Sequence, residues 1–185
     1  LLLKHNRFFI CFIFLLCFIP AFSQSQYWLQ KAGGLTIDEA MDISIDGNGN
    51  TYTTGYFTAT ASFGSTNISS SGTTDIFLTK IDNQGIFQWA VKAGGSSPDK
   101  GLSIATDLQG NSYVTGFFSA TANFGTQTIT SNGLQDVFIS KFDNAGNIIW
   151  VRNAGGTNND IGNGISVDNS GNIVVTGEFT GTAQF

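Results

Sequence analysis

A motif that recurs every 61 residues organises most of this chain. Asp46-Gly47-Asn48-Gly49-Asn50 is followed at that interval by Asp107-Leu108-Gln109-Gly110-Asn111 and by Asp168-Asn169-Ser170-Gly171-Asn172. The neighbouring residues keep the same register, which defines repeat copies at 28–88 and 89–149 and a shorter third copy at 150–185. A fixed period of this length is the signature of an architecture built from one repeated supersecondary unit.

A second Asp-x-x-Gly sequence lies inside each full copy, at Asp82–Gly85 and Asp143–Gly146. Asp followed three residues later by Gly is typical of a tight turn, because the carboxylate accepts backbone N–H groups and Gly adopts the left-handed conformation. The flanking segments are rich in β-branched and aromatic residues, as strands are. Two hairpins per copy predict a four-stranded antiparallel unit.

We therefore expect an all-β chain made of β-propeller blades. A period of 61 residues exceeds the roughly 40–50 of common blades, and the surplus falls in 58–74 and 119–135. There we expect an elaborated connection between the second and third strands, anchored by Phe63 and Phe124. A ring needs at least about four blades, so 24–185 is expected to be an incomplete ring, with the remaining blades in the same polypeptide.

Composition agrees with short strands joined by turns. Only 11% of residues are charged, whereas Gly occurs 23 times and Phe 17 times. This content of large apolar side chains is enough for a buried core and argues against disorder. Outside the first 23 residues, six basic side chains face 13 acidic ones, so no basic surface is available and nucleic acid is not an expected partner.

Residues 1–23 have the pattern of a secretory signal peptide. Lys4 and Arg7 precede an apolar run at 8–19, and Ala21-Phe22-Ser23 resembles a cleavage site. The run is shorter than the roughly 20 residues that a membrane span needs. We expect a secreted or cell-surface protein without a transmembrane span in its mature chain.

The only His and both Cys, namely His5, Cys11 and Cys17, lie inside this leader. The mature chain is therefore expected to lack Ser/His/Asp and Cys/His catalysis, Cys/His zinc sites and disulfides.

The repeat also resembles a known family. Trp89-Ala90-Val91-Lys92-Ala93-Gly94-Gly95, then Asp99, then Asp107-x-x-Gly110-Asn111-x-Tyr113-Val114-Thr115-Gly116 is similar to the SBBP-type bacterial β-propeller repeat. The other two copies match as well, except that Val174 replaces the Tyr in the third. The resemblance implies a secreted or cell-surface propeller, often from Bacteroidetes-like bacteria, and it transfers no catalytic residue.

Asp46, Asn48 and Asn50 alternate like the start of a calcium-binding loop. The sixth position is Thr51 rather than Gly, and no Glu follows at the twelfth. The other copies replace Asn48 by Gln109 and Ser170, whereas the turn-forming residues persist. A structural turn is the favoured interpretation and a calcium site the alternative; no other cofactor is expected.

Asp38, Asp99 and Asp160 follow the paired glycines of each copy by four residues. In a propeller they could line one rim and contact a cation or sugar hydroxyls. The alternative is that each carboxylate caps its own loop by accepting backbone N–H groups.

Other residues give weaker signals. Glu39 and Glu178 are the only glutamates and do not recur as the carboxylate pair that glycoside hydrolysis needs. A Trp in each copy fits the core between blades better than a sugar platform. The glycine pairs lack the Lys of a phosphate loop.

The sequence thus favours a non-catalytic binding or structural module with a protein or carbohydrate ligand. Two alternatives stay open: an accessory propeller of a larger secreted enzyme, for example one acting on polysaccharide, and a calcium-stabilised surface adhesin.

Overall fold

The computed structural model describes residues 28–184, in which the chain forms strands and turns and no helix. The predicted leader, including His5, Cys11 and Cys17, lies outside the described residues. The expectation of an all-β chain is confirmed.

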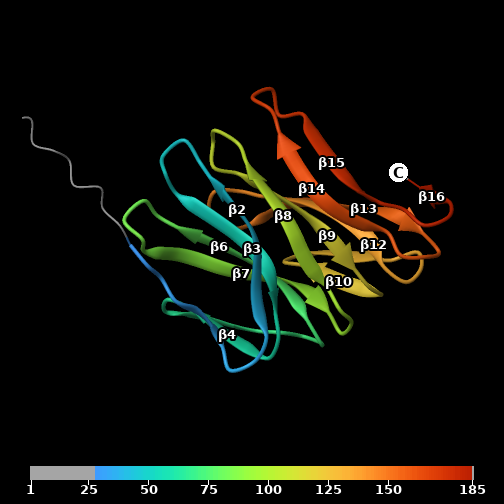
Figure 1. The fold of residues 1–185 in the computed structure, drawn as a ribbon, viewed down its shortest axis with the longest axis horizontal. Coiled ribbons are helices and arrows are strands. Elements are labelled where there is room, and N and C mark those ends of the chain that lie inside the picture. The colour runs from blue at the N-terminus through green and yellow to red at the C-terminus, as the bar shows by residue number, and fades with distance from the viewer. Residues whose placement is uncertain (1–27, 185) are drawn as a thin grey trace, which may run out of the picture.

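Each blade is a set of antiparallel strands in sequence order, and its last strand lies mostly at the start of the next repeat copy (Figure 1). Blade 1 contains β2 (Asp38–Ile45), β3 (Thr51–Phe57), β6 (Asp75–Ile81) and β7 (Phe87–Gly95). Blade 2 contains β8 (Lys100–Thr106), β9 (Ser112–Phe118), β12 (Asp136–Phe142) and β13 (Ile148–Gly156). Blade 3 contains β14 (Ile161–Val167) and β15 (Ile173–Glu178). The predicted Asp-x-x-Gly turns join these strands in pairs, so the four-stranded blade is confirmed.

The surplus of the long repeat forms a third hairpin, which the sequence predicted only as an elaborated connection. Its strands are β4 (Thr60–Phe63) and β5 (Thr66–Ser69) in the first copy, and β10 (Thr121–Phe124) and β11 (Gln127–Thr130) in the second. A full copy therefore holds six strands rather than four. The strands are four residues long and rich in Ser, Thr and Asn, so their polar sequence gives little strand signal.

This extra hairpin belongs spatially to the preceding blade. β10 pairs with β7, aligning Phe124 with Ala93. The short strands β1 (Ala32–Gly34) and β16 (Ala183–Gln184) make the equivalent pairings with β4 and β13. The expected anchors are confirmed, because Phe63 and Phe124 are buried and pack on Phe77 and Phe138 with ring centroids 5.0 Å apart.

The β10–β11 hairpin also shields β13, the outer strand of blade 2. β11 lies against β13, where the Gln127 side chain accepts from the Val151 N–H at 3.2 Å and donates to the Ile149 oxygen at 3.0 Å. Asn153 of β13 donates in turn to the Thr130 oxygen. An unprotected edge strand invites pairing with other chains, and here a side-chain amide occupies those backbone groups.

Blades pack face to face. The first strands β2, β8 and β14 are neighbours in that order, and the blades stand side by side in Figure 1. The main core fills the junction of blades 1 and 2, where Ile76 and Leu78 of one blade meet Phe138 and Val114 of the next. These antiparallel sheets, repeated at a fixed period and packed on their faces, are β-propeller blades.

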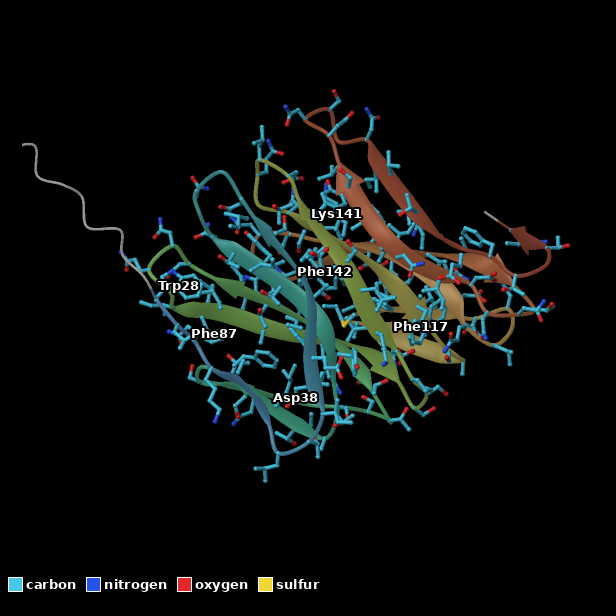
Figure 2. The ribbon with its side chains drawn as sticks, in the orientation of Figure 1. Trp28, Asp38, Phe87, Phe117, Lys141 and Phe142 are labelled. Carbon is cyan, nitrogen blue, oxygen red and sulfur yellow. The ribbon has the colours of Figure 1, made fainter. Side chains whose placement is uncertain are left out.

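The opposite face of blade 1 carries apolar side chains at positions that are packed between blades one repeat later. Ile43 on this face is 61% exposed, whereas Ile104, one repeat later, is 5% exposed against blade 1. A hollow of about 210 Å³ lies here, bordered by Trp28 and Phe87, which are seen near each other in Figure 2. Within residues 28–184, no blade covers this surface.

Candidate functional site

The Asp-x-x-Gly turns use their carboxylates to hold the backbone. Asp46 Oδ1 accepts the N–H groups of Asn48 at 2.9 Å and Asn50 at 3.0 Å, and Oδ2 accepts the Asn50 side-chain amide at 2.8 Å. The same pattern of two N–H donors recurs at Asp82, Asp107, Asp143 and Asp168. The proposed calcium ligands of the sequence analysis thus bond to one another as a turn.

These bonds change the acidity of the turn carboxyls. Burial alone would raise the pKa of Asp46, but donation from Asn50, Asn48 and Tyr52 outweighs it and holds the pKa below its ordinary value. Asp107 shows the same balance, with Asn111, Tyr113 and Gln109 as donors. The ionised form of each carboxyl is therefore part of the folded turn.

One turn residue connects two blades. Asn144, in the second hairpin of blade 2, accepts the Lys80 ammonium on its side-chain oxygen and the Trp89 indole N–H on its backbone oxygen at 3.1 Å. The Tyr52 hydroxyl lies within 3.1 Å of the same side-chain oxygen. Trp89 also packs edge-on to Tyr52, so this repeated Trp lies at the junction between blades.

A polar hollow of about 230 Å³ opens between the first turns of blades 2 and 3. Lys141 borders it, held over the Tyr113 ring and 3.9 Å from Asp107. Gln109 and Asn169 supply exposed side chains from the two turns. At the junction of blades 1 and 2 the equivalent space is filled by Asn144, whose turn contacts Lys80, Tyr52 and Gly110. Within residues 28–184 blade 3 has no second hairpin to fill the hollow in the same way.

The carboxylates after the glycine pairs lie at the blade junctions. Asp99 and Asp160 are fully buried, whereas Asp38 is half-buried. Asp99 accepts the N–H groups of Gly95 at 2.7 Å and Ser119 at 3.0 Å, which belong to different blades. Asp160 makes the equivalent bonds to Gly156 and Thr180, and Asp38 accepts from Gly34.

Close approach of the backbone explains the second glycine of each pair. A Cβ on Gly34, Gly95 or Gly156 would stand 2.1, 1.9 or 2.0 Å from a carbonyl oxygen of the added hairpin or its equivalent. No side chain fits at this distance, so each extra hairpin requires a glycine on the strand that it extends.

Two further pairs of residues recur at the repeat interval, and the sequence alone gives them no role. Asp75 and Asp136 are fully buried beside Asp99 and Asp160, and Lys80 and Lys141 lie over the rings of Tyr52 and Tyr113. Their recurrence at the repeat interval was the available signal. The neighbouring blade that places Asp99 beside Asp75, and Asp160 beside Asp136, could not be read from the sequence.

Comparison with known proteins supports the architecture. No family model matches the chain. An uncharacterized WD repeat-containing protein of Acanthamoeba polyphaga mimivirus, L264, is 30% identical over 121 residues, which cover 56% of this chain and 9% of that protein. The chain thus spans a small part of the length of this relative. Together with the blades, the similarity defines a β-propeller-type repeat protein.

Residues 28–184 lack two further features. This part of the chain holds no group of three or more His, Cys, Asp or Glu arranged to bind a metal ion. It also contains no helix with the length and hydrophobicity of a membrane span.

Proposed function

We propose that this chain is part of a secreted or cell-surface propeller of the SBBP repeat type and serves as a non-catalytic binding module. The signal-peptide pattern at 1–23 supports export. The repeated Trp, glycine-pair and Asp-x-x-Gly-Asn positions support the family. In this proposal further blades of the same polypeptide cover the open face of blade 1.

The observation that carries the binding role is the surface formed by the first turns of the blades, which expose the side chains of Asn48, Gln109 and Ser170. Its framework is constant, because Asp, Gly and Asn recur in each first turn. The exposed positions vary, with Asn48, Gln109 and Ser170 at the same place in the three copies. A constant scaffold that presents variable loop side chains is the usual arrangement of a recognition surface.

The chemistry of the surface favours binding over catalysis. The turn carboxylates are held as hydrogen-bond acceptors by their own loops, and no His or Cys follows residue 23. Glu178 accepts from Asn163 on its own hairpin. The side chains that the first turns expose are amides and a hydroxyl, which suit the hydroxyl groups of a polysaccharide or the polar groups of a protein surface.

The test is a binding screen of the leaderless chain against arrayed polysaccharides and, separately, extracellular proteins. Gln109→Ala should lower retention of the ligand found. Gln84→Ala is the matched control, because Gln84 holds the same position in the second hairpin turn of blade 1, outside the first turns. Equal binding by the two variants would refute this site, and recovery of the full-length protein solely in the cytosol would refute export.

A second candidate is an accessory propeller within a larger secreted enzyme. The match to 9% of a much longer protein favours a module in a longer polypeptide. Under this proposal the substrate of the enzyme, such as a polysaccharide, would also be the ligand of the first turns, and deletion of the propeller would raise KM while leaving kcat unchanged.

A further inference from the structure

The junction of blades 1 and 2 buries two carboxylates beside one glycine. Asp75 and Asp99 are both 0% exposed. A Cβ on Gly94 would stand 2.8 Å from Asp75 Cγ and 2.9 Å from Asp99 Oδ2. The two side chains therefore share one small, closed space, at the end of the strands opposite the first turn of blade 1.

Hydrogen bonds satisfy this pair incompletely. Both oxygens of Asp99 accept backbone N–H groups, from Gly95 and Ser119. Asp75 Oδ2 accepts the Ser71 N–H at 2.9 Å, but the buried Oδ1 has no hydrogen-bond partner. A buried carboxylate oxygen without a donor is costly when the group is ionised.

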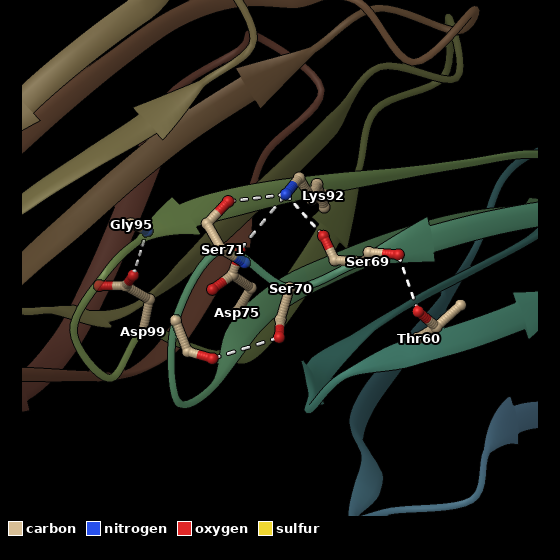
Figure 3. A network of polar contacts seen from close by, with 9 residues as sticks. Thr60, Ser69, Ser70, Ser71, Asp75, Lys92, Gly95 and Asp99 are labelled. Carbon is tan, nitrogen blue, oxygen red and sulfur yellow. Dashed lines mark hydrogen bonds and ion pairs between the residues drawn. The ribbon is translucent and has the colours of Figure 1, made fainter.

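The charges around the pair are unbalanced (Figure 3). Lys92 on β7 stands 3.8 Å from Asp75 Oδ2 and also donates to the Ser69 oxygen at 2.6 Å and the Ser71 hydroxyl at 2.7 Å. Lys100 on β8 is directed elsewhere, with its ammonium 3.6 Å from the centre of the Tyr56 ring. Of the charged groups described on the elements packed here, two buried anions thus face one partly exposed cation.

Two carboxylates in one dry space do not both ionise easily. Burial raises the pKa of Asp99 to about 7, with the charge of Asp75 adding to the effect and the N–H donors of Ser119 and Gly95 opposing it. Burial also raises the pKa of Asp75, against its bonds to Ser71 and the charge of Lys92.

We propose that Asp75 and Asp99 form a coupled carboxyl pair that takes up one proton near neutral pH and thereby strengthens the junction of blades 1 and 2. A proton fits this space better than a metal ion does. Calcium requires six to eight oxygen ligands, whereas the α-carbon of Gly94 borders both carboxylates and leaves less than the room for a methyl group.

The direction of the pH effect follows from linkage. The folded state binds the proton of Asp99 more tightly than the unfolded chain, where the ordinary value is 3.8. The stabilisation is fully present below that value and is lost as the pH rises to about 7. Protonation thus strengthens this junction, contrary to the usual behaviour of a hydrogen-bonded surface carboxylate.

The second junction provides a natural comparison. Asp136 and Asp160 border Gly155 in the same way, and Asp136 Oδ1 likewise has no partner. Asn153 occupies the position equivalent to Lys92. Lys92→Asn therefore removes the cation from the first junction, as in the second, while keeping both carboxylates. The second junction differs further in having Asn132, which donates to Asp136, in place of Ser71.

The test is an NMR titration of the full-length protein labelled with ¹³C at the Asp carboxyl carbons, between pH 4 and 9. One carboxyl should titrate near pH 7, and Asp99→Asn should remove that signal. Asp75→Asn should lower the midpoint by at least one pH unit, and Lys92→Asn should raise it. Thermal melts of the same proteins at pH 5 and pH 8 should show that the wild type loses melting temperature with rising pH and that Asp99→Asn does not.

The proposal is overturned if no Asp of this junction titrates above pH 6. It is also overturned if the midpoint is the same in Lys92→Asn and the wild type, a comparison that stands even where Asp75→Asn does not fold. Addition of CaCl₂ or EDTA at pH 7 is the control for a metal ion: a calcium-dependent change of the Asp75 and Asp99 signals would assign the space to a cation instead.

Discussion

Gly95 lies against Thr121 so closely that a Cβ on the glycine would stand 1.9 Å from the threonine carbonyl oxygen. This contact joins the outer strand of blade 1 to the hairpin that blade 2 contributes, and it recurs between Gly34 and Thr60 and between Gly156 and Thr182. The glycine pairs of the repeat are thus the places where one repeat is joined to the next.

Gly95→Ala should therefore destabilise the protein strongly. The methyl group cannot be accommodated without separating β10 from β7, and we expect a loss of about 3 kcal/mol or more in the free energy of unfolding. Urea denaturation monitored by Trp fluorescence measures it. Gly47→Ala is the control, because a Cβ there meets nothing within 4 Å, and its effect should stay within about 0.5 kcal/mol. Equal stability of the two variants would contradict the contact.

Two asparagines at the same turn position should behave differently. The Asn144 side-chain oxygen accepts a hydrogen bond from Lys80 and lies within hydrogen-bond distance of the Tyr52 hydroxyl, both on the neighbouring blade. Asn83, in contrast, donates one bond to the Asn48 oxygen at an exposed site. Asn144→Ala should cost about 1–3 kcal/mol, because it leaves a charged donor unpaired. Asn83→Ala should cost clearly less in the same denaturation measurement. The reverse order would show that the cross-blade bonds contribute little.

Acid should destabilise the turns. Since its donors hold the pKa of Asp107 below the ordinary 3.8, the stabilisation from its ionised form is present above that value and is lost as the pH falls through the lower folded pKa. Asp107→Asn should reduce the fall in melting temperature between pH 4 and pH 2. If the melting temperature of this variant falls as much between pH 4 and pH 2 as that of the wild type, the turn bonds do not depend on the negative charge of Asp107.

Calcium should leave the melting temperature unchanged. Both oxygens of Asp46 already accept donors from Asn48, Asn50 and Tyr52, so a metal ion would have to displace them. Differential scanning fluorimetry in CaCl₂ and in EDTA is the measurement. A melting temperature that is clearly higher in CaCl₂ than in EDTA, with a difference that Asn48→Ala abolishes, would instead establish the first turn as a metal site and favour the adhesin hypothesis.

The sequence was most informative where local chemistry decides the structure. Asp46 and its equivalents define tight turns through contacts within five residues, so the period and the turn residues were sufficient to predict the blades. The hairpin β10–β11 was missed because non-local contacts stabilise its short polar strands. These contacts are the pairing of β10 with β7 and the bonds of Gln127 to the β13 backbone. The buried state of Asp99 was equally invisible, since it depends on N–H groups from two blades.

Ligand binding at the first turns of the blades is the central functional claim, and calorimetric titration of the screened ligand tests it most directly. The protein carrying Asn48→Ala and Gln109→Ala should bind at least about ten-fold more weakly than the wild type, corresponding to about 1.4 kcal/mol. The Gln84→Ala control should bind normally, and no product should form from the ligand. Unchanged affinity in the double variant, or turnover of the ligand by the wild type, would contradict a binding module at this site.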